Sequence, residues 1–155
     1  MKAVTLFLYS AGTLLLCTAA SKFVSSFGHA AILQMRDPLI GIQFQNLFRL
    51  VGTVEFVIGL ACCIFVRQFL ILAGLVAWLA TCFASYRIGL YLIGYHKPCS
   101  CLGNLTDALH IPPQTANTTM EIILAYLLLG SYAILFWLWR QKIKASQAYL
   151  PVGSV

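Results

Sequence analysis

The chain has 155 residues, of which 61% are hydrophobic and only 9% are charged. Soluble domains carry about 25% charged residues, so the composition excludes an ordinary soluble protein, and the length fits one compact bundle over residues 1–155. The formal net charge of +6 is not expected to indicate nucleic acid binding in so apolar a chain, and we interpret the basic residues as determinants of membrane topology.

Four apolar runs are long enough to cross a bilayer, whose hydrocarbon core needs roughly 20 apolar residues per helix. The expected spans are residues 3–22, 48–66, 69–95 and 120–139. The second and third are so close in sequence that we expect a helical hairpin. We therefore predict an all-α membrane protein, built as a four-transmembrane-helix bundle.

The orientation follows from Lys and Arg, which are retained near span ends on the cytoplasmic side. With the N-terminus inside, that side would hold Lys2, Arg67, Arg140, Lys142 and Lys144, against Lys22, Arg36, Arg49 and Lys97 outside. The C-terminal basic cluster decides which side of the membrane carries more Lys and Arg residues. We expect a multi-pass protein of the bacterial inner (cytoplasmic) membrane with both termini cytoplasmic.

The first span also has features of a signal peptide, with Lys2 before the apolar run and small residues at 18–21 near its end. The hydrophobic region of a signal peptide is about 7 to 15 residues long. This run is longer, so we expect it to be retained as a span.

The strongest chemical signal is the segment HKPCSCLGNL at residues 96–105, which follows the third span. It contains Cys99 and Cys101, whereas the other four cysteines fall within apolar runs, where we expect Cys62, Cys63 and Cys82 to be small packing residues. Two cysteines one residue apart reach disulfide distance only if the chain bends sharply, and a strained disulfide is easily reduced. Lys97, and His96 when protonated, would favour the reactive thiolate. We predict a redox-active pair facing the periplasm.

Two other interpretations of the pair remain open. Cys99 and Cys101 could form a static clasp or pack as small apolar side chains. They could also bind a metal with His96 and His110, since thiolates and imidazoles suit zinc or Cu(I). The one-residue spacing, however, departs from the two to four residues typical of structural zinc sites.

Two charged residues lie within predicted spans, where a charge costs on the order of 3 kcal/mol and is usually paired. Counting about 1.5 Å per residue places Glu55 and Arg87 each about 12 Å from the outer ends of their helices, so the two can meet. Lys22 closes the first span on the same side, and Tyr91 follows Arg87 at helical spacing. We expect a polar chamber in the outer leaflet.

The role of this chamber stays open at the level of sequence. Glu55 and Arg87 could form an ion pair that only fixes helix register. They could instead bind a quinone headgroup or relay protons during thiol oxidation. The small residues Gly52, Gly59, Ala80, Ala84 and Gly89 are expected at contacts between helices.

Several short motifs together resemble a known family. They are Ser21-Lys22-Phe23, Asp37-Pro38, Glu55, Tyr86-Arg87 and PCSCLG at residues 98–103. The chain resembles the DoxX-like membrane proteins from its first span to its fourth, and it is most similar to the MauE family of methylamine utilisation proteins.

That resemblance implies a four-helix membrane protein that forms or transfers disulfides with a periplasmic thioredoxin-like partner, in MauE's case during methylamine dehydrogenase maturation. Cys99 and Cys101 would be the redox pair and Gly103 its turn, while Lys22, Glu55 and Arg87 match polar positions without an assigned role.

Our preferred hypothesis is a membrane-embedded thiol:disulfide oxidoreductase that requires no cofactor, with a quinone as a candidate acceptor. A metal-handling membrane protein and a non-catalytic membrane subunit of a redox complex are the alternatives. The cysteine pair distinguishes the three, because only the oxidoreductase needs it to cycle between dithiol and disulfide.

Overall fold

The computed structural model describes residues 2–27, 33, 36–94 and 113–148. Its long helices are α1 (Lys2–Ser26), α3 (Phe44–Ile64), α4 (Phe69–Leu92) and α6 (Pro113–Ala148). All four are long and apolar enough to cross a membrane. The predicted all-α, four-helix membrane class is therefore confirmed.

Most helices extend beyond the apolar runs from which they were predicted. α3 begins at Phe44 rather than at residue 48, and α6 continues to Ala148 past its basic residues. A run of apolar residues marks only the part of a helix that lies in the hydrocarbon core. The hydrogen-bonded helix itself can continue into the interface between membrane and water.

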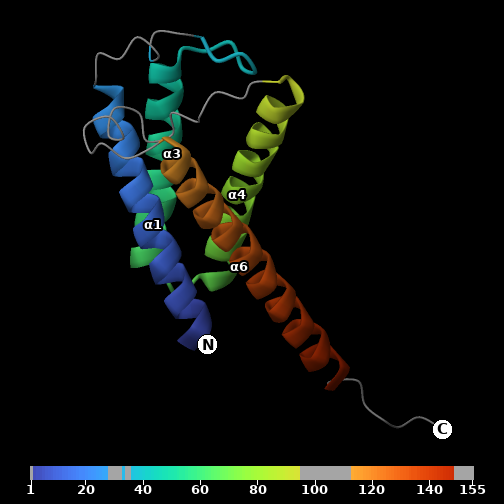
Figure 1. The fold of residues 1–155 in the computed structure, drawn as a ribbon. Coiled ribbons are helices and arrows are strands. Elements are labelled where there is room, and N and C mark those ends of the chain that lie inside the picture. The colour runs from blue at the N-terminus through green and yellow to red at the C-terminus, as the bar shows by residue number, and fades with distance from the viewer. Residues whose placement is uncertain (1, 28–32, 34–35, 95–112, 149–155) are drawn as a thin grey trace, which may run out of the picture.

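The helices are arranged as two pairs, α1 with α3 and α4 with α6, and the contacts within each pair are more extensive than those between the pairs (Figure 1). α1 begins and α6 ends on the same side of the bundle (Figure 1). At the opposite end, α1 and α4 end while α3 and α6 begin. We call this the long-loop end, because the connections 27–43 and 93–112 both join helices there.

Glycines bring α1 and α3 unusually close together. A Cβ atom on Gly59 would lie 3.0 Å from the carbonyl oxygen of Gly12, and one on Gly12 would meet the side chain of Cys62. Gly52 lies along the same interface, opposite Lys22. Gly52 and Gly59 therefore lie at the contact of α1 and α3, as predicted, and at Gly59 even a methyl group would be closer to α1 than an ordinary van der Waals contact.

The core lies where α1 meets the other helices. Its fully or nearly buried side chains include Leu8, Leu15, Val76 and Leu127, which come from α1, α4 and α6. Ala80 is also buried, as expected for a small packing residue. Because the outer faces carry large exposed apolar residues, the bundle is suited to a lipid environment.

The end of the first connection folds into a tight turn centred on Asp37. The Asp37 carboxylate accepts hydrogen bonds from the backbone N–H groups of Leu39 and Ile40, at 2.8 and 2.9 Å. Gly41, at φ 76°, supplies the left-handed conformation that closes the turn. Leu39 packs against Gly89, which was predicted to contact another helix and instead receives this loop side chain.

Candidate functional site

A buried ion pair joins α1 to α3. The amine of Lys22 donates to both carboxylate oxygens of Glu55, at 2.7 and 2.8 Å. The exposed fractions of the two side chains are 10% and 2%. The Lys22 nitrogen also lies 5.6 Å from the ring centroid of Phe83 on α4, so a third helix covers the pair.

Glu55 and Arg87 do not pair, which corrects the expectation from their equal depths. Arg87 forms an ion pair with Glu121 at 2.9 Å and donates to the side-chain oxygen of Asn117 at 2.7 Å, both on α6. Depth along a helix leaves the direction around its axis undetermined. Arg87 faces α6, whereas Glu55 faces α1.

A cavity of about 340 Å³ lies between the two helix pairs, toward the long-loop end. All four helices line it, α1 from Leu14 to Lys22 and α3 from Phe44 to Glu55. At about 1.5 Å per residue, the lining covers about 12 Å of α1. The cavity is therefore long enough to admit a small organic ring and part of a chain.

The cavity wall is mostly apolar, which corrects the expected polar chamber. Its aliphatic and aromatic lining includes Leu15, Ile40, Phe44, Leu47, Phe48, Leu50, Val51, Phe83, Ile123, Leu124 and Leu127. The lining residues that carry a polar or sulfur-containing group are Thr18, Lys22, Glu55, Cys82, Tyr86, Arg87 and Met120. A few polar groups within an apolar wall are typical of sites for small organic ligands.

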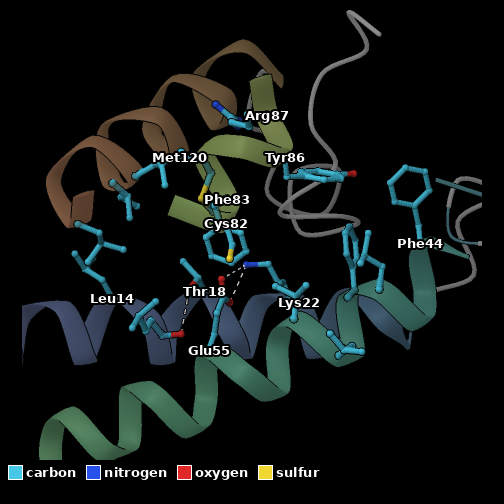
Figure 2. A pocket seen from close by; sticks show the side chains of 18 of the residues that line it. Leu14, Thr18, Lys22, Phe44, Glu55, Cys82, Phe83, Tyr86, Arg87 and Met120 are labelled. Atoms are coloured by element: carbon cyan, nitrogen blue, oxygen red, sulfur yellow. Dashed lines mark hydrogen bonds and ion pairs between the residues drawn. The ribbon is translucent and has the colours of Figure 1, made fainter. Parts of the chain in front are cut away.

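The charged groups lie on facing walls of this cavity. Figure 2 shows the Lys22 amine directed at the Glu55 carboxylate on the α1 and α3 side, whereas Arg87 extends from α4 toward α6 on the far side. Each cation has a carboxylate partner, Glu55 for Lys22 and Glu121 for Arg87. Both cations that line the cavity are therefore paired with a carboxylate.

A second polar contact ties the first loop to the cavity wall. The hydroxyl of Tyr86 on α4 donates to the carboxylate of Asp37, whose exposed fraction is 1%. Ile40 from the same turn lines the cavity. The Asp37 turn is thus anchored to α4 where it contributes to the cavity wall.

One predicted site residue does not line this cavity, and several others lie outside the described residues. Tyr91 follows Arg87 on α4, but its side chain is 72% exposed and does not line the cavity. Residues outside the described ranges are Tyr95, His96, Lys97, Cys99, Cys101, Gly103 and His110. Within the described residues, no group of three or more His, Cys, Asp or Glu side chains is arranged to hold a metal ion.

The four described cysteines are free thiols in different settings. Cys62 is fully buried at the interface of α1 and α3, as expected for a small packing residue. Cys82, for which the same role was expected, is instead exposed and lines the cavity. A thiol at this position can report on occupancy of the cavity.

The sequence did not indicate three contributors to the site, namely Asn117, Glu121 and the pairing of Asp37 with Tyr86. Asn117 and Glu121 are four residues apart in sequence, which places them on one helix face, where they hydrogen bond at 2.8 Å. This four-residue spacing was the sequence feature that could have indicated their contact. Nothing in the local sequence links Asp37 to Tyr86, since the contact joins a loop to a distant helix.

The site can hold a largely apolar molecule. Lys22 and Arg87 lie in its wall, and neither is left as an uncompensated charge. No family model, curated protein or solved structure matches this chain.

Proposed function

We propose that this chain is a membrane-embedded thiol:disulfide redox protein in which Cys99 and Cys101 are the reactive pair. The partner would be a soluble thioredoxin-like protein of the periplasm. The proposal follows the resemblance to MauE-type proteins, which act in disulfide formation during methylamine dehydrogenase maturation. In this scheme the protein lies in a bacterial inner membrane with the pair on the periplasmic side.

The observation that carries the proposal is the position of the charged cavity within the bundle. The connection 93–112, which contains the cysteine pair, joins α4 to α6 at the long-loop end. The cavity with Lys22, Glu55 and Arg87 lies toward that same end. A purely structural bundle has no need of the buried Lys22–Glu55 ion pair beside an open space, since apolar packing is at least as stable.

The reaction is a dithiol–disulfide exchange. A thiolate of the reduced partner attacks the Cys99–Cys101 disulfide, which forms a mixed disulfide and releases one cysteine of the pair. The second partner thiol then resolves the mixed disulfide. The partner is oxidised by two electrons, and Cys99 and Cys101 become two thiols that need an acceptor to be reoxidised.

Thiol trapping in membranes tests this proposal. A variant with Ala at Cys17, Cys62, Cys63 and Cys82 retains only the pair, so each thiol adds one step in mass with a large maleimide. Redox cycling predicts no shift after oxidation and a double shift after reduction. In the single Cys99→Ser and Cys101→Ser variants, the remaining thiol should attack the disulfide of the oxidised partner and form a mixed disulfide, with release of one partner thiol, whereas Ser100→Ala should behave as the parent protein.

The alternatives give different results in the same experiment. Thiols that react only after treatment with a chelator would indicate metal binding. A pair that stays oxidised and never forms a mixed disulfide would be a structural clasp. A partner that is fully active without either cysteine would identify a non-catalytic subunit. Each of these outcomes contradicts the oxidoreductase proposal.

A further inference from the structure

We infer that the C-terminal part of α6 binds an anionic phospholipid, with the phosphate held by Arg140 and Lys144 and an acyl chain packed along Phe136 and Trp139. We call these four residues the α6 stripe. The inference does not depend on the proposed redox function. It is carried by the charge of this end of the bundle, by the depth of the cations in the membrane and by their position on one helix face.

The end of the bundle opposite the long-loop end carries only basic side chains among its charged residues. Here α1 begins, a short connection joins α3 to α4, and α6 ends (Figure 1). Five of the ten Lys and Arg residues lie at this end, and all five are exposed. They are Lys2, Arg67, Arg140, Lys142 and Lys144.

The four acidic residues of the chain all lie elsewhere. Glu55 and Glu121 form ion pairs beside the cavity. Asp37 and Asp107 belong to the long connections 27–43 and 93–112. Among the residues that the structure describes, no carboxylate pairs with any of the five exposed cations. Negative charge at this end therefore has to come from outside the chain.

The depth of the cations favours lipid headgroups over a partner in water. Lys2 directly precedes the apolar run of α1, and Arg140 directly follows Trp139 at the end of the apolar run of α6. Lys144 lies five residues beyond Trp139, or about 7.5 Å along the helix axis. The headgroup layer on each side of a bilayer is about 5 to 8 Å thick. These cations therefore lie at the level of the phosphates.

The α6 stripe has the order of groups that a phospholipid requires. Phe136, Arg140 and Lys144 follow one another at four-residue spacing, so they share one face of the helix. The Arg140 guanidinium lies 5.6 Å from the ring centroid of Phe136, and the ring of Trp139 lies 6.0 Å from that of Phe136. Both rings are more than half exposed. An acyl chain can pack on these rings while the phosphate reaches the two cations.

The same arrangement favours an anionic lipid over a zwitterionic one. Phosphatidylcholine carries an ammonium group that compensates its own phosphate. Phosphatidylglycerol and cardiolipin have no such group, so their phosphates keep a net negative charge. Groups of four to eight Lys and Arg residues beside a membrane span are typical of sites for anionic lipids. The five cations at this end of the bundle fall within that range.

The natural tryptophans allow binding to be measured in a bilayer. The full chain carrying Trp78→Phe retains Trp137 and Trp139. It is reconstituted in phosphatidylcholine vesicles that contain brominated phosphatidylglycerol or, separately, brominated phosphatidylcholine, because bromine quenches tryptophan fluorescence on contact. Phosphatidylglycerol should quench more strongly at equal mole fraction, which gives its relative binding constant. Equal quenching by the two lipids would overturn the inference.

Substitutions locate the phosphate on α6. Lys144→Gln should lower the relative binding constant about fivefold, the effect of one cation near an anionic surface. Lys142→Gln is the matched control, because it removes the same charge about 200° around the helix axis from Lys144 and should have a smaller effect. Equal effects of the two substitutions would mean that the charge is felt diffusely, and the α6 stripe would not be the site.

A pair of double variants separates local charge from the net charge of the protein. Arg140→Gln with Lys144→Gln should abolish the preference for phosphatidylglycerol, whereas Arg140→Lys with Lys144→Arg should retain it. Arg36→Gln with Arg49→Gln removes two exposed cations before and at the start of α3 and should also retain it. Loss of the preference in this last variant would contradict a site on α6.

Salt and a soluble polyanion complete the test. Raising the salt concentration from 0.1 M to 1 M shortens the Debye length from about 10 Å to about 3 Å, so the preference should fall. A preference that is unchanged in 1 M salt would contradict binding through charge. If a short duplex DNA binds the protein in phosphatidylcholine vesicles and phosphatidylglycerol shows no preference, the partner is a soluble polyanion and the inference fails.

Discussion

Lys22 and Glu55 form an ion pair that is almost completely enclosed, with the lysine amine 2.7 Å from one carboxylate oxygen and 2.8 Å from the other. The pair formed by Arg87 and Glu121 is more open, with exposed side-chain fractions of 22% and 56%. Burial changes the energetics of such pairs, because water and salt screen an open pair and hardly reach an enclosed one. The two pairs should therefore respond differently to substitution.

Lys22→Met should destabilise the protein strongly because it leaves the Glu55 carboxylate buried without its cation. Loss of one partner of a buried pair costs about 3 to 5 kcal/mol. The measurement is the free energy of unfolding in mixed micelles. Glu55→Leu should have a comparable effect, because it strands the lysine instead.

The double variant Lys22→Met, Glu55→Leu is the control for this prediction. It removes both charges and replaces them with apolar side chains of similar volume, so we expect most of the lost stability to return. Losses that simply add in the double variant would show that the two side chains are not energetically coupled.

Arg87→Gln should change the free energy of unfolding by less than about 1 kcal/mol, because exposed ion pairs contribute little. The glutamine can still hydrogen bond to Asn117, which the arginine contacts at 2.7 Å. The measurement is thermal unfolding of Arg87→Gln, compared with that of Arg140→Gln. A loss as large as that of Lys22→Met would mean that Arg87 carries a structural role which its exposure does not indicate.

Tyr86→Phe should loosen the turn centred on Asp37. The variant removes one donor from a carboxylate that is 1% exposed, and a buried group left short of a partner costs about 1 to 3 kcal/mol. Limited proteolysis of residues 27–43 measures the effect. Faster cleavage is expected because the turn loses its anchor on α4.

The matched control is Tyr9→Phe, the same change at a half-exposed position on α1. Its cleavage rate should equal that of the parent protein. If Tyr86→Phe is cleaved no faster than this control, the hydrogen bond does not hold the turn in place.

Gly59→Val should separate α1 from α3. Its Cβ would lie 3.0 Å from the backbone oxygen of Gly12, and a backbone atom cannot move aside as a flexible side chain can. Overpacking of this kind costs about 1 to 3 kcal/mol. Gly74→Ala on α4 is the control, because nothing lies within 4 Å of its added methyl group. Equal stability of the two variants would contradict the close helix contact.

The proposed orientation predicts which cysteines react in intact spheroplasts. After reduction, a membrane-impermeant maleimide should label Cys99 and Cys101 from outside. A cysteine introduced by Ser146→Cys in the tail should react only after permeabilisation. The opposite pattern would reverse the topology, which rests on the basic cluster after the fourth span.

The helices themselves could be predicted from the sequence. Long apolar runs identify spans because a buried backbone in lipid must form its hydrogen bonds within the helix. Gly52 and Gly59 were correctly predicted at helix contacts, because small residues in membrane helices let two backbones pack closely. These properties depend on composition and local order along the chain.

The site could be predicted only in part. The sequence selected Lys22, Glu55 and Arg87 because charges are costly within a span. It paired Glu55 with Arg87, although the structure joins Glu55 to Lys22 and Arg87 to Glu121. Depth follows from counting residues, but the direction of a side chain around the helix axis depends on which helices pack together.

Sequence by itself thus determined the membrane class, the four spans and the residues whose charges need partners. Only the tertiary structure decided that α1 pairs with α3 and α4 with α6, which in turn fixed the partners of Lys22 and Arg87. The same pairing leaves an apolar cavity between the two pairs rather than a polar chamber. The physical reason is that hydropathy acts on each helix separately, whereas partners and cavities arise from the contacts between helices.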